Sequence, residues 1–148
     1  MTVFVLSLLL VACGDEKEIK SWIAKTNDLL FEATKQSEVI PYQLAQHEAL
    51  RSYFAELAVK IATVKESAKA TKSLNSVLTE MDLNDVCTKI LMPKAQWVKV
   101  MQRCTKNRYF LCSEEVRAYP DVIASLMLVL NADMKKKFSE TEACRIAL

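Results

Sequence analysis

Glycine is almost missing from this chain of 148 residues, and its single glycine, Gly14, lies near the start. A protein built from β-hairpins uses glycine in its tight turns. The loops that surround phosphate groups in nucleotide-binding proteins are also rich in glycine, and an EF-hand calcium loop requires one. The sequence therefore lacks the P-loop, dinucleotide-binding and EF-hand motifs, and it argues against a β fold.

The chain also lacks a large excess of charge of either sign. Its 20 basic and 18 acidic residues are interspersed and leave a net charge of +2, so we expect no nucleic-acid partner. The longest run of like charge, 135–137, is typical of a solvated helix end, and a membrane-surface or partner patch is the alternative. With 51% hydrophobic residues, the chain can form a core, and its length favours one domain.

Histidine occurs only once, as His47, and this limits the possible chemistry. The pair His47-Glu48 does not begin an H-E-x-x-H zinc motif, because position 51 is Arg51. Asp82 and Asp85 are interpreted as residues that cap a helix start. Since no nucleophile, base and orienting group occur together, we expect no enzymatic activity, no cofactor and no metal site.

The start of the chain has the pattern of an export signal. Residues 3–12 form an apolar run of ten residues, which suits the h-region of a signal peptide and is too short for a transmembrane helix. The usual basic residues are missing from residues 1–4. Either the true start therefore lies upstream of Met1, or the signal peptide is of a different type.

Residues 10–13, "LVAC", resemble the lipobox of bacterial lipoproteins at all four positions. The resemblance implies that residues 1–12 are a signal peptide and that Cys13 becomes the diacylated N-terminus of an exported domain, 13–148. Gly14 follows Cys13 where lipoproteins of the inner membrane tend to carry Asp, which implies sorting to the outer membrane, facing the periplasm. The resemblance ends at Cys13 and implies no activity.

Two other outcomes remain open for this segment. An ordinary signal peptidase can cut near Gly14, so that Asp15 becomes the first mature residue of a freely secreted protein. The apolar segment can also be retained as a hydrophobic terminus.

Four cysteines remain after Cys13, and an even number in an oxidising compartment predicts two disulfides. The gaps between them are 16, 7 and 31 residues, which do not fit the close pairs of a structural zinc site. Three pairings are possible. We favour Cys104–Cys112, which closes a short loop, together with Cys87–Cys144 as the longer link.

Apolar residues recur every three or four positions, which predicts helices throughout. In the first helix, one face carries Ile19, Trp22, Ile23, Thr26, Leu30 and Ala33. The second carries a heptad stripe at His47, Leu50, Phe54, Leu57, Ile61, Val64 and Ala68. These two helices are predicted to form a long N-terminal hairpin. In the segment that follows, we expect a kink near Ser73.

Shorter helices are expected in the second half, over 82–92, 93–104 and 120–138. The helix over 120–138 is the most apolar, so we expect it at the centre of the bundle. Ser139 and Glu142 resemble a capping box that starts the last helix. The predicted fold is an all-α helical bundle with a long N-terminal helical hairpin, stapled by two disulfides.

A candidate partner-binding site is the segment Arg108, Tyr109 and Phe110, between Cys104 and Cys112. Arginine and aromatic residues in a loop held by a disulfide have the composition of a binding hot spot. In the alternative interpretation, Phe110 fills the core and Arg108 extends along its surface.

These features predict an outer-membrane lipoprotein that acts as a non-enzymatic adaptor or accessory factor for another envelope protein. Secretion-system pilotins and plasmid exclusion proteins have a similar build. One alternative is an immunity or inhibitor protein that blocks a toxin or an enzyme in the periplasm. Another is a freely secreted helical ligand-binding protein, with a cavity lined by Leu126, Met127, Leu128 and Leu130.

Overall fold

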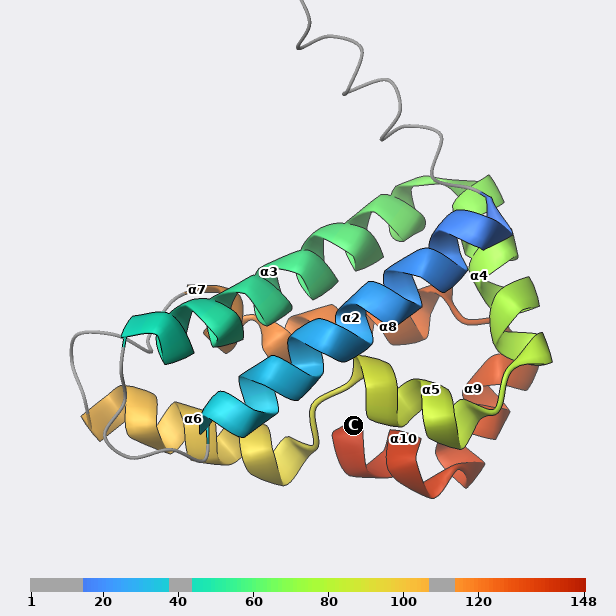
Figure 1. The fold of residues 1–148 in the computed structure, drawn as a ribbon. Coiled ribbons are helices and arrows are strands. Elements are labelled where there is room, and N and C mark those ends of the chain that lie inside the picture. The colour runs from blue at the N-terminus through green and yellow to red at the C-terminus, as the bar shows by residue number, and fades with distance from the viewer. Residues whose placement is uncertain (1–14, 38–43, 107–113) are drawn as a thin grey trace, which may run out of the picture.

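The computed structural model describes residues 15–37, 44–106 and 114–148, without the side chains of 36–37, 44–47 and 104–106. All regular secondary structure in these ranges is helical (Figure 1). The predicted all-α class is therefore confirmed.

Helices α2 (Glu16–Ser37) and α3 (Leu44–Glu66) are the longest, and they pack side by side in opposite directions (Figure 1). All six residues expected on the core-facing side of α2 are buried, including the polar Thr26. The buried positions of the stripe on α3 are Leu50, Phe54, Leu57, Ile61 and Val64. Residues 38–43, where the predicted hairpin would turn, lie outside the described ranges.

The helical path breaks at Ser67, and the predicted kink near Ser73 is wrong. The Ser67 hydroxyl accepts a hydrogen bond from the Ala70 amide at 3.2 Å and so caps α4 (Ala68–Glu80), which satisfies a free amide of its first turn. Because the stripe ends at this break, Ala68 is exposed. Helix α4 then runs across the end of the α2–α3 pair (Figure 1).

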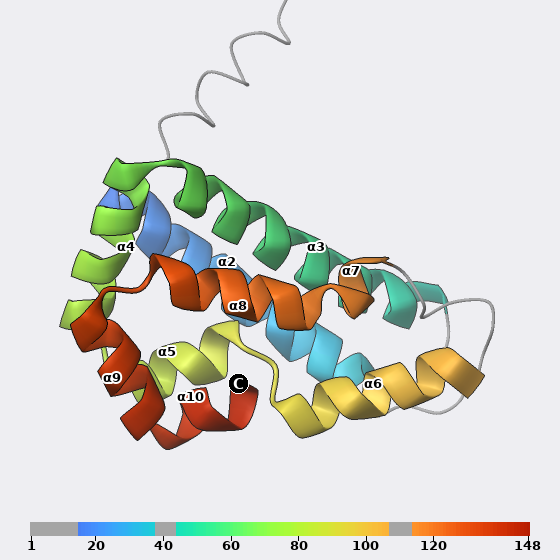
Figure 2. The same cartoon turned by 180° about the vertical axis from the view of Figure 1, so that it is seen from behind.

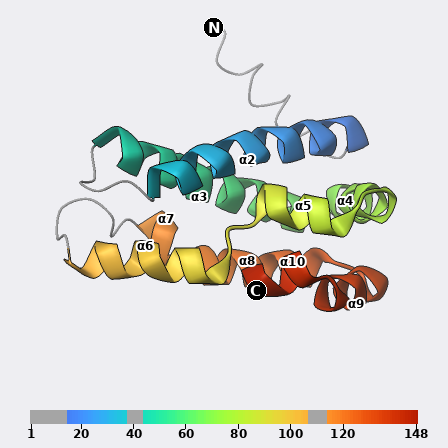
Figure 3. The same ribbon diagram turned by 60° about the horizontal axis from the view of Figure 1, so that its bottom comes forward.

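Helix α5 (Leu83–Ile90) begins where Asp82 was expected to cap a helix. The Asp82 carboxylate accepts a hydrogen bond from the Asn84 amide at 3.0 Å. Figure 3 shows α5 between α2 and the C-terminal helices, and it contacts both α2 and α10 (Glu142–Ala147). The short α5 therefore links the two sides of the core.

The single helix expected over 120–138 is two helices, α8 (Tyr119–Val129) and α9 (Ala132–Glu140). Asn131 ends the path of α8 and caps α9 by accepting a hydrogen bond from the Met134 amide at 2.9 Å. Helix α8 is also not central, because its Leu128 is 67% exposed. It packs with one face against α3 and leaves the other face to solvent (Figure 2).

The predicted capping box of the last helix is also wrong. Ser139 is still part of α9, and its hydroxyl donates to the Lys136 carbonyl at 2.7 Å. The residue before α10 is Thr141, whose hydroxyl donates to the Lys137 carbonyl. The Thr141 side chain therefore bonds back into α9 and does not cap α10.

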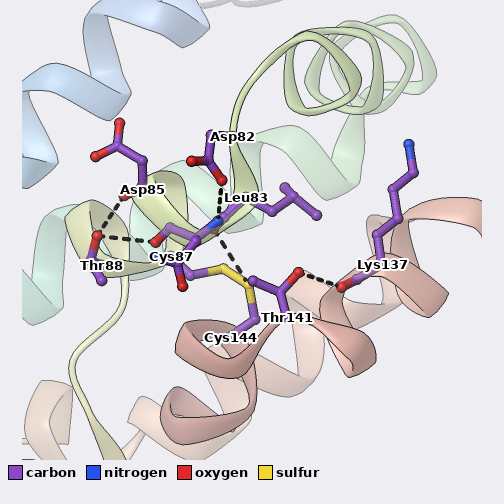
Figure 4. Close-up of a disulfide and its surroundings, with 9 residues drawn as sticks. Asp82, Leu83, Asp85, Cys87, Thr88, Lys137, Thr141 and Cys144 are labelled. Atoms are coloured by element: carbon purple, nitrogen blue, oxygen red, sulfur yellow. Dashed lines mark hydrogen bonds between the residues drawn. A yellow bond between two sulfur atoms is a disulfide. The ribbon is translucent and has the colours of Figure 1, made fainter.

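The disulfide Cys87–Cys144 joins α5 to α10 and is buried at both ends (Figure 4). The Cys144 sulfur also lies 3.6 Å from the Leu83 carbonyl oxygen. The predicted pair Cys104–Cys112 cannot be followed, because the Cys104 side chain and Cys112 lie outside the described residues. The structure therefore contains one of the two expected disulfides within the part that it describes.

Candidate functional site

The predicted site residues fall mostly outside the part of the chain that the structure describes. These are Cys13, Arg108, Tyr109, Phe110 and Cys112. The described elements on either side of these residues nevertheless show where each segment is attached, at opposite ends of the α2–α3 pair (Figure 1).

The first attachment point is the start of α2. The Asp15 carboxylate accepts a hydrogen bond from the Lys17 amide at 3.1 Å, so the helix begins with a capped turn. The Ser76 hydroxyl of α4 donates to the Glu16 carboxylate at 2.7 Å, which ties this turn to α4. Only Gly14 separates Asp15 from Cys13, so these two residues lie at most about 7 Å apart along an extended chain. We call this region the anchor end.

The second attachment point lies at the other end of the bundle, where α6 (Lys94–Lys106) ends and α7 (Glu114–Arg117) begins (Figure 1). The Trp97 indole donates to the Val116 carbonyl at 2.9 Å and so joins α6 to α7. Arg51 of α3 lies 3.6 Å from Glu115 of α7. The α7 side of residues 107–113 thus packs against α3, and the first turn of α6 is bonded to α7. We call this region the far end.

Two buried tyrosines brace the link between α5 and α6. The Tyr53 hydroxyl donates to the Ile90 carbonyl at 2.7 Å and accepts from the Met92 amide at 3.0 Å. The Tyr119 hydroxyl donates to the Met92 carbonyl at 3.0 Å. These bonds satisfy backbone groups that no helix pairs.

Burial sets the electrostatics of this tyrosine pair. It raises the pKa of Tyr119 to about 12 and moves the pKa of Tyr53 well above its ordinary value, because the charged form is disfavoured away from water. Both hydroxyls therefore stay protonated at neutral pH and serve as structural donors.

Sequence reasoning missed a second polar junction, around Asn75 of α4. Its side-chain amide donates to the carbonyls of Thr71 and Val129, each at 2.8 Å. Its side-chain oxygen accepts from the Asn131 amide at 2.8 Å. Asn75 thus holds the break between α8 and α9. A single Asn in an amphipathic pattern gives no sign of such long-range partners.

Open grooves lie along two helices of the described part. A groove of about 530 Å³ runs between α3 and α8, with the small residues Ala58 and Ala62 among its lining and Lys65 and Asp121 at its sides. A second groove, of about 550 Å³, runs along the surface of α4 and is also lined by Asn131. Both are open to solvent, so they are surface features rather than enclosed binding sites.

The expected ligand cavity around 126–130 is not formed. Leu126 and Leu130 are buried in the core, whereas Leu128 is 67% exposed. The internal void beside Leu126 measures about 10 Å³, which is less than a bound organic ligand needs. Because a helix turns about 100° per residue, consecutive side chains cannot line the same cavity.

No group of three or more His, Cys, Asp or Glu side chains in the described ranges is placed to hold a metal ion. In the same ranges, no helix combines the length and the apolar character that a bilayer span requires.

Comparison with known proteins gives no relative for this chain. No family model matches it, and neither a curated protein nor a solved structure is significantly similar.

Proposed function

We propose that this chain is a bacterial outer-membrane lipoprotein, anchored by acyl chains on Cys13, that binds another envelope protein and is not an enzyme. The observation that carries the proposal is the position of α2. A capped helix begins at Glu16, only three residues after the lipobox-like cysteine. An anchor at Cys13 would hold the folded body directly at the membrane surface.

The geometry of the two ends supports a partner site at the far end. Helix α2 has 22 residues and is therefore about 33 Å long. With the anchor end at the membrane and α2 upright, the far end would lie about that far from the lipid surface. Arg108, Tyr109 and Phe110 would then face the periplasm, where another protein can reach them.

A disulfide Cys104–Cys112 is part of this proposal. It would close the seven residues between the two cysteines and reduce the conformational freedom that the segment loses on binding. On the other side of the segment, α7 packs against α3, where Arg51 lies 3.6 Å from Glu115.

Mass spectrometry of the N-terminal peptide from the native host tests the anchor. We expect a mature chain that starts at Cys13 and carries acyl groups on this residue. The matched variant Cys13→Ser should remain unprocessed and unacylated, with the same helical spectrum. An unmodified peptide that starts at Asp15 would contradict the proposal and indicate a freely secreted protein.

A further inference from the structure

Three exposed lysines surround the corner between α3 and α4. Lys65 lies in the last turn of α3, Lys69 in the first turn of α4, and Lys72 one turn further on. We call these three the corner lysines. Among the described residues none of them forms an ion pair, whereas the nearby Lys20 pairs with Glu80 at 3.6 Å.

The corner is fixed next to the anchor end. The Thr71 hydroxyl donates to the Val64 carbonyl at 2.9 Å, across the break between α3 and α4. The bond between Ser76 and Glu16 holds α4 against the first turn of α2. The corner between α3 and α4, which carries these lysines, therefore lies at the same end of the molecule as the start of α2 (Figure 1).

The charge at the corner is positive. Residues 65–72 contain three lysines and a single acidic residue, Glu66, and Asp121 of α8 lines the same groove as Lys65. The start of α2 carries the acidic residues Asp15, Glu16 and Glu18, so the positive patch is confined to the corner itself. Lys69 is also not explained by helix stability, because a cation in a first turn is disfavoured by the helix dipole.

We infer that the corner lysines bind the anionic phospholipid headgroups of the membrane that holds the Cys13 anchor. This inference rests on the proposed function. Lysine side chains near an anionic surface are attracted to it within a Debye length. Since Cys13 lies so close to Asp15, the corner is brought within that range without any further linker. The second contact would fix the orientation of the bundle on the membrane.

Lysine acylation footprinting on the full lipidated protein tests the inference. The protein is placed in vesicles of phosphatidylethanolamine with phosphatidylglycerol, and in vesicles of phosphatidylcholine alone. We expect each corner lysine to react about fivefold more slowly in the anionic vesicles. High salt, which shortens the Debye length to about 3 Å at 1 M, should remove the difference. Lys35 and Lys99, exposed and without an ion pair in the described part, should react equally in both.

A matched pair of triple variants separates attraction from mere proximity. The readout is Lys17, an exposed residue in the first turn of α2. In the unaltered protein, we expect Lys17 also to react more slowly with the acylating reagent in the anionic vesicles. This difference should disappear in the variant K65Q/K69Q/K72Q and remain in the variant K35Q/K94Q/K99Q.

The outcomes distinguish the inference from the proposed function. Acylated protein whose corner lysines react equally in both vesicle types would overturn the inference alone. So would protection that appears only when envelope proteins are added, because it would indicate a protein partner at the corner. A chain without acyl groups would overturn the proposed function and the orientation together.

Discussion

At the scale of single residues, Tyr53 carries more hydrogen bonds than any pattern in the sequence indicates. Its ring belongs to the core, where it packs edge-on against Phe54 at 5.1 Å between ring centroids. Its hydroxyl serves two backbone groups of the link between α5 and α6. The residue thus combines apolar burial with the pairing of otherwise free polar groups.

The variant Tyr53→Phe is expected to lower the free energy of unfolding by roughly 2–4 kcal/mol, because it leaves the Ile90 carbonyl and the Met92 amide buried and unpaired. Tyr119→Phe removes a single donor, to Met92, and should cost roughly 1–2 kcal/mol. Urea denaturation at neutral pH measures both. Equal losses for the two variants would show that the Tyr53 hydroxyl is not shared between two backbone groups.

Arg108, Tyr109 and Phe110 are expected to contribute more to partner binding than to folding. Their joint replacement by alanine should cost roughly 2–4 kcal/mol of binding free energy, measured by pull-down of the partner from envelope extracts. If Phe110 instead fills the core, Phe110→Ala alone should cost roughly 3–5 kcal/mol of stability. A large fall in melting temperature with unchanged binding would therefore reject the hot spot.

At the scale of helices, the sequence predicts the helical faces better than the breaks between helices. The stripe on α3 is buried from Leu50 to Val64, because the period of 3.6 residues determines which side faces the core. The breaks depend on partners far along the chain. Helix α8 ends before Asn131, whose backbone amide donates a hydrogen bond to the side-chain oxygen of Asn75, 56 positions away. No local pattern contains that information.

The variant Asn75→Ala tests the polar junction between α4 and α8–α9. It should lower the free energy of unfolding by roughly 2–4 kcal/mol, because the Val129 carbonyl and the Asn131 amide lose their buried partner. Asn84→Ala, at an exposed position, should change it by less than about 0.5 kcal/mol. Thermal denaturation of the two variants gives the comparison, and a similar small effect for both would contradict this role.

For the candidate site too, local sequence patterns indicate single segments but not the contacts between them. The lipobox-like residues and the spacing of the cysteines can be read from the sequence, and the bond Cys87–Cys144 is present. The proximity of α4 to the start of α2 cannot be read in this way, because it depends on the cap at Ser67 and on the contact between Glu16 and Ser76. The corner lysines are therefore close together in the sequence, but only the tertiary structure brings them near the start of α2.

At the scale of the whole molecule, the disulfide closes a long loop that contains α6, α7, α8 and α9. Its cysteines are 57 positions apart, and the loss of chain entropy in the unfolded state predicts a stabilisation of about 4 kcal/mol. The double variant Cys87→Ala/Cys144→Ala should lower the melting temperature by roughly 8–16 °C. Calorimetry measures this shift. An unchanged melting temperature would show that the packing of α5 against α10 holds the two sides together without the bond.

The short connection between Cys13 and Asp15 also has a thermodynamic consequence. Two soluble proteins give up translational and rotational freedom when they associate, and this loss weakens their affinity. On the proposed anchor, part of that freedom is already lost before the partner arrives, because a single residue, Gly14, separates the anchor from Asp15. A partner in the same membrane would meet the far end at a high effective concentration. A contact that is weak in solution would then be sufficient on the membrane surface.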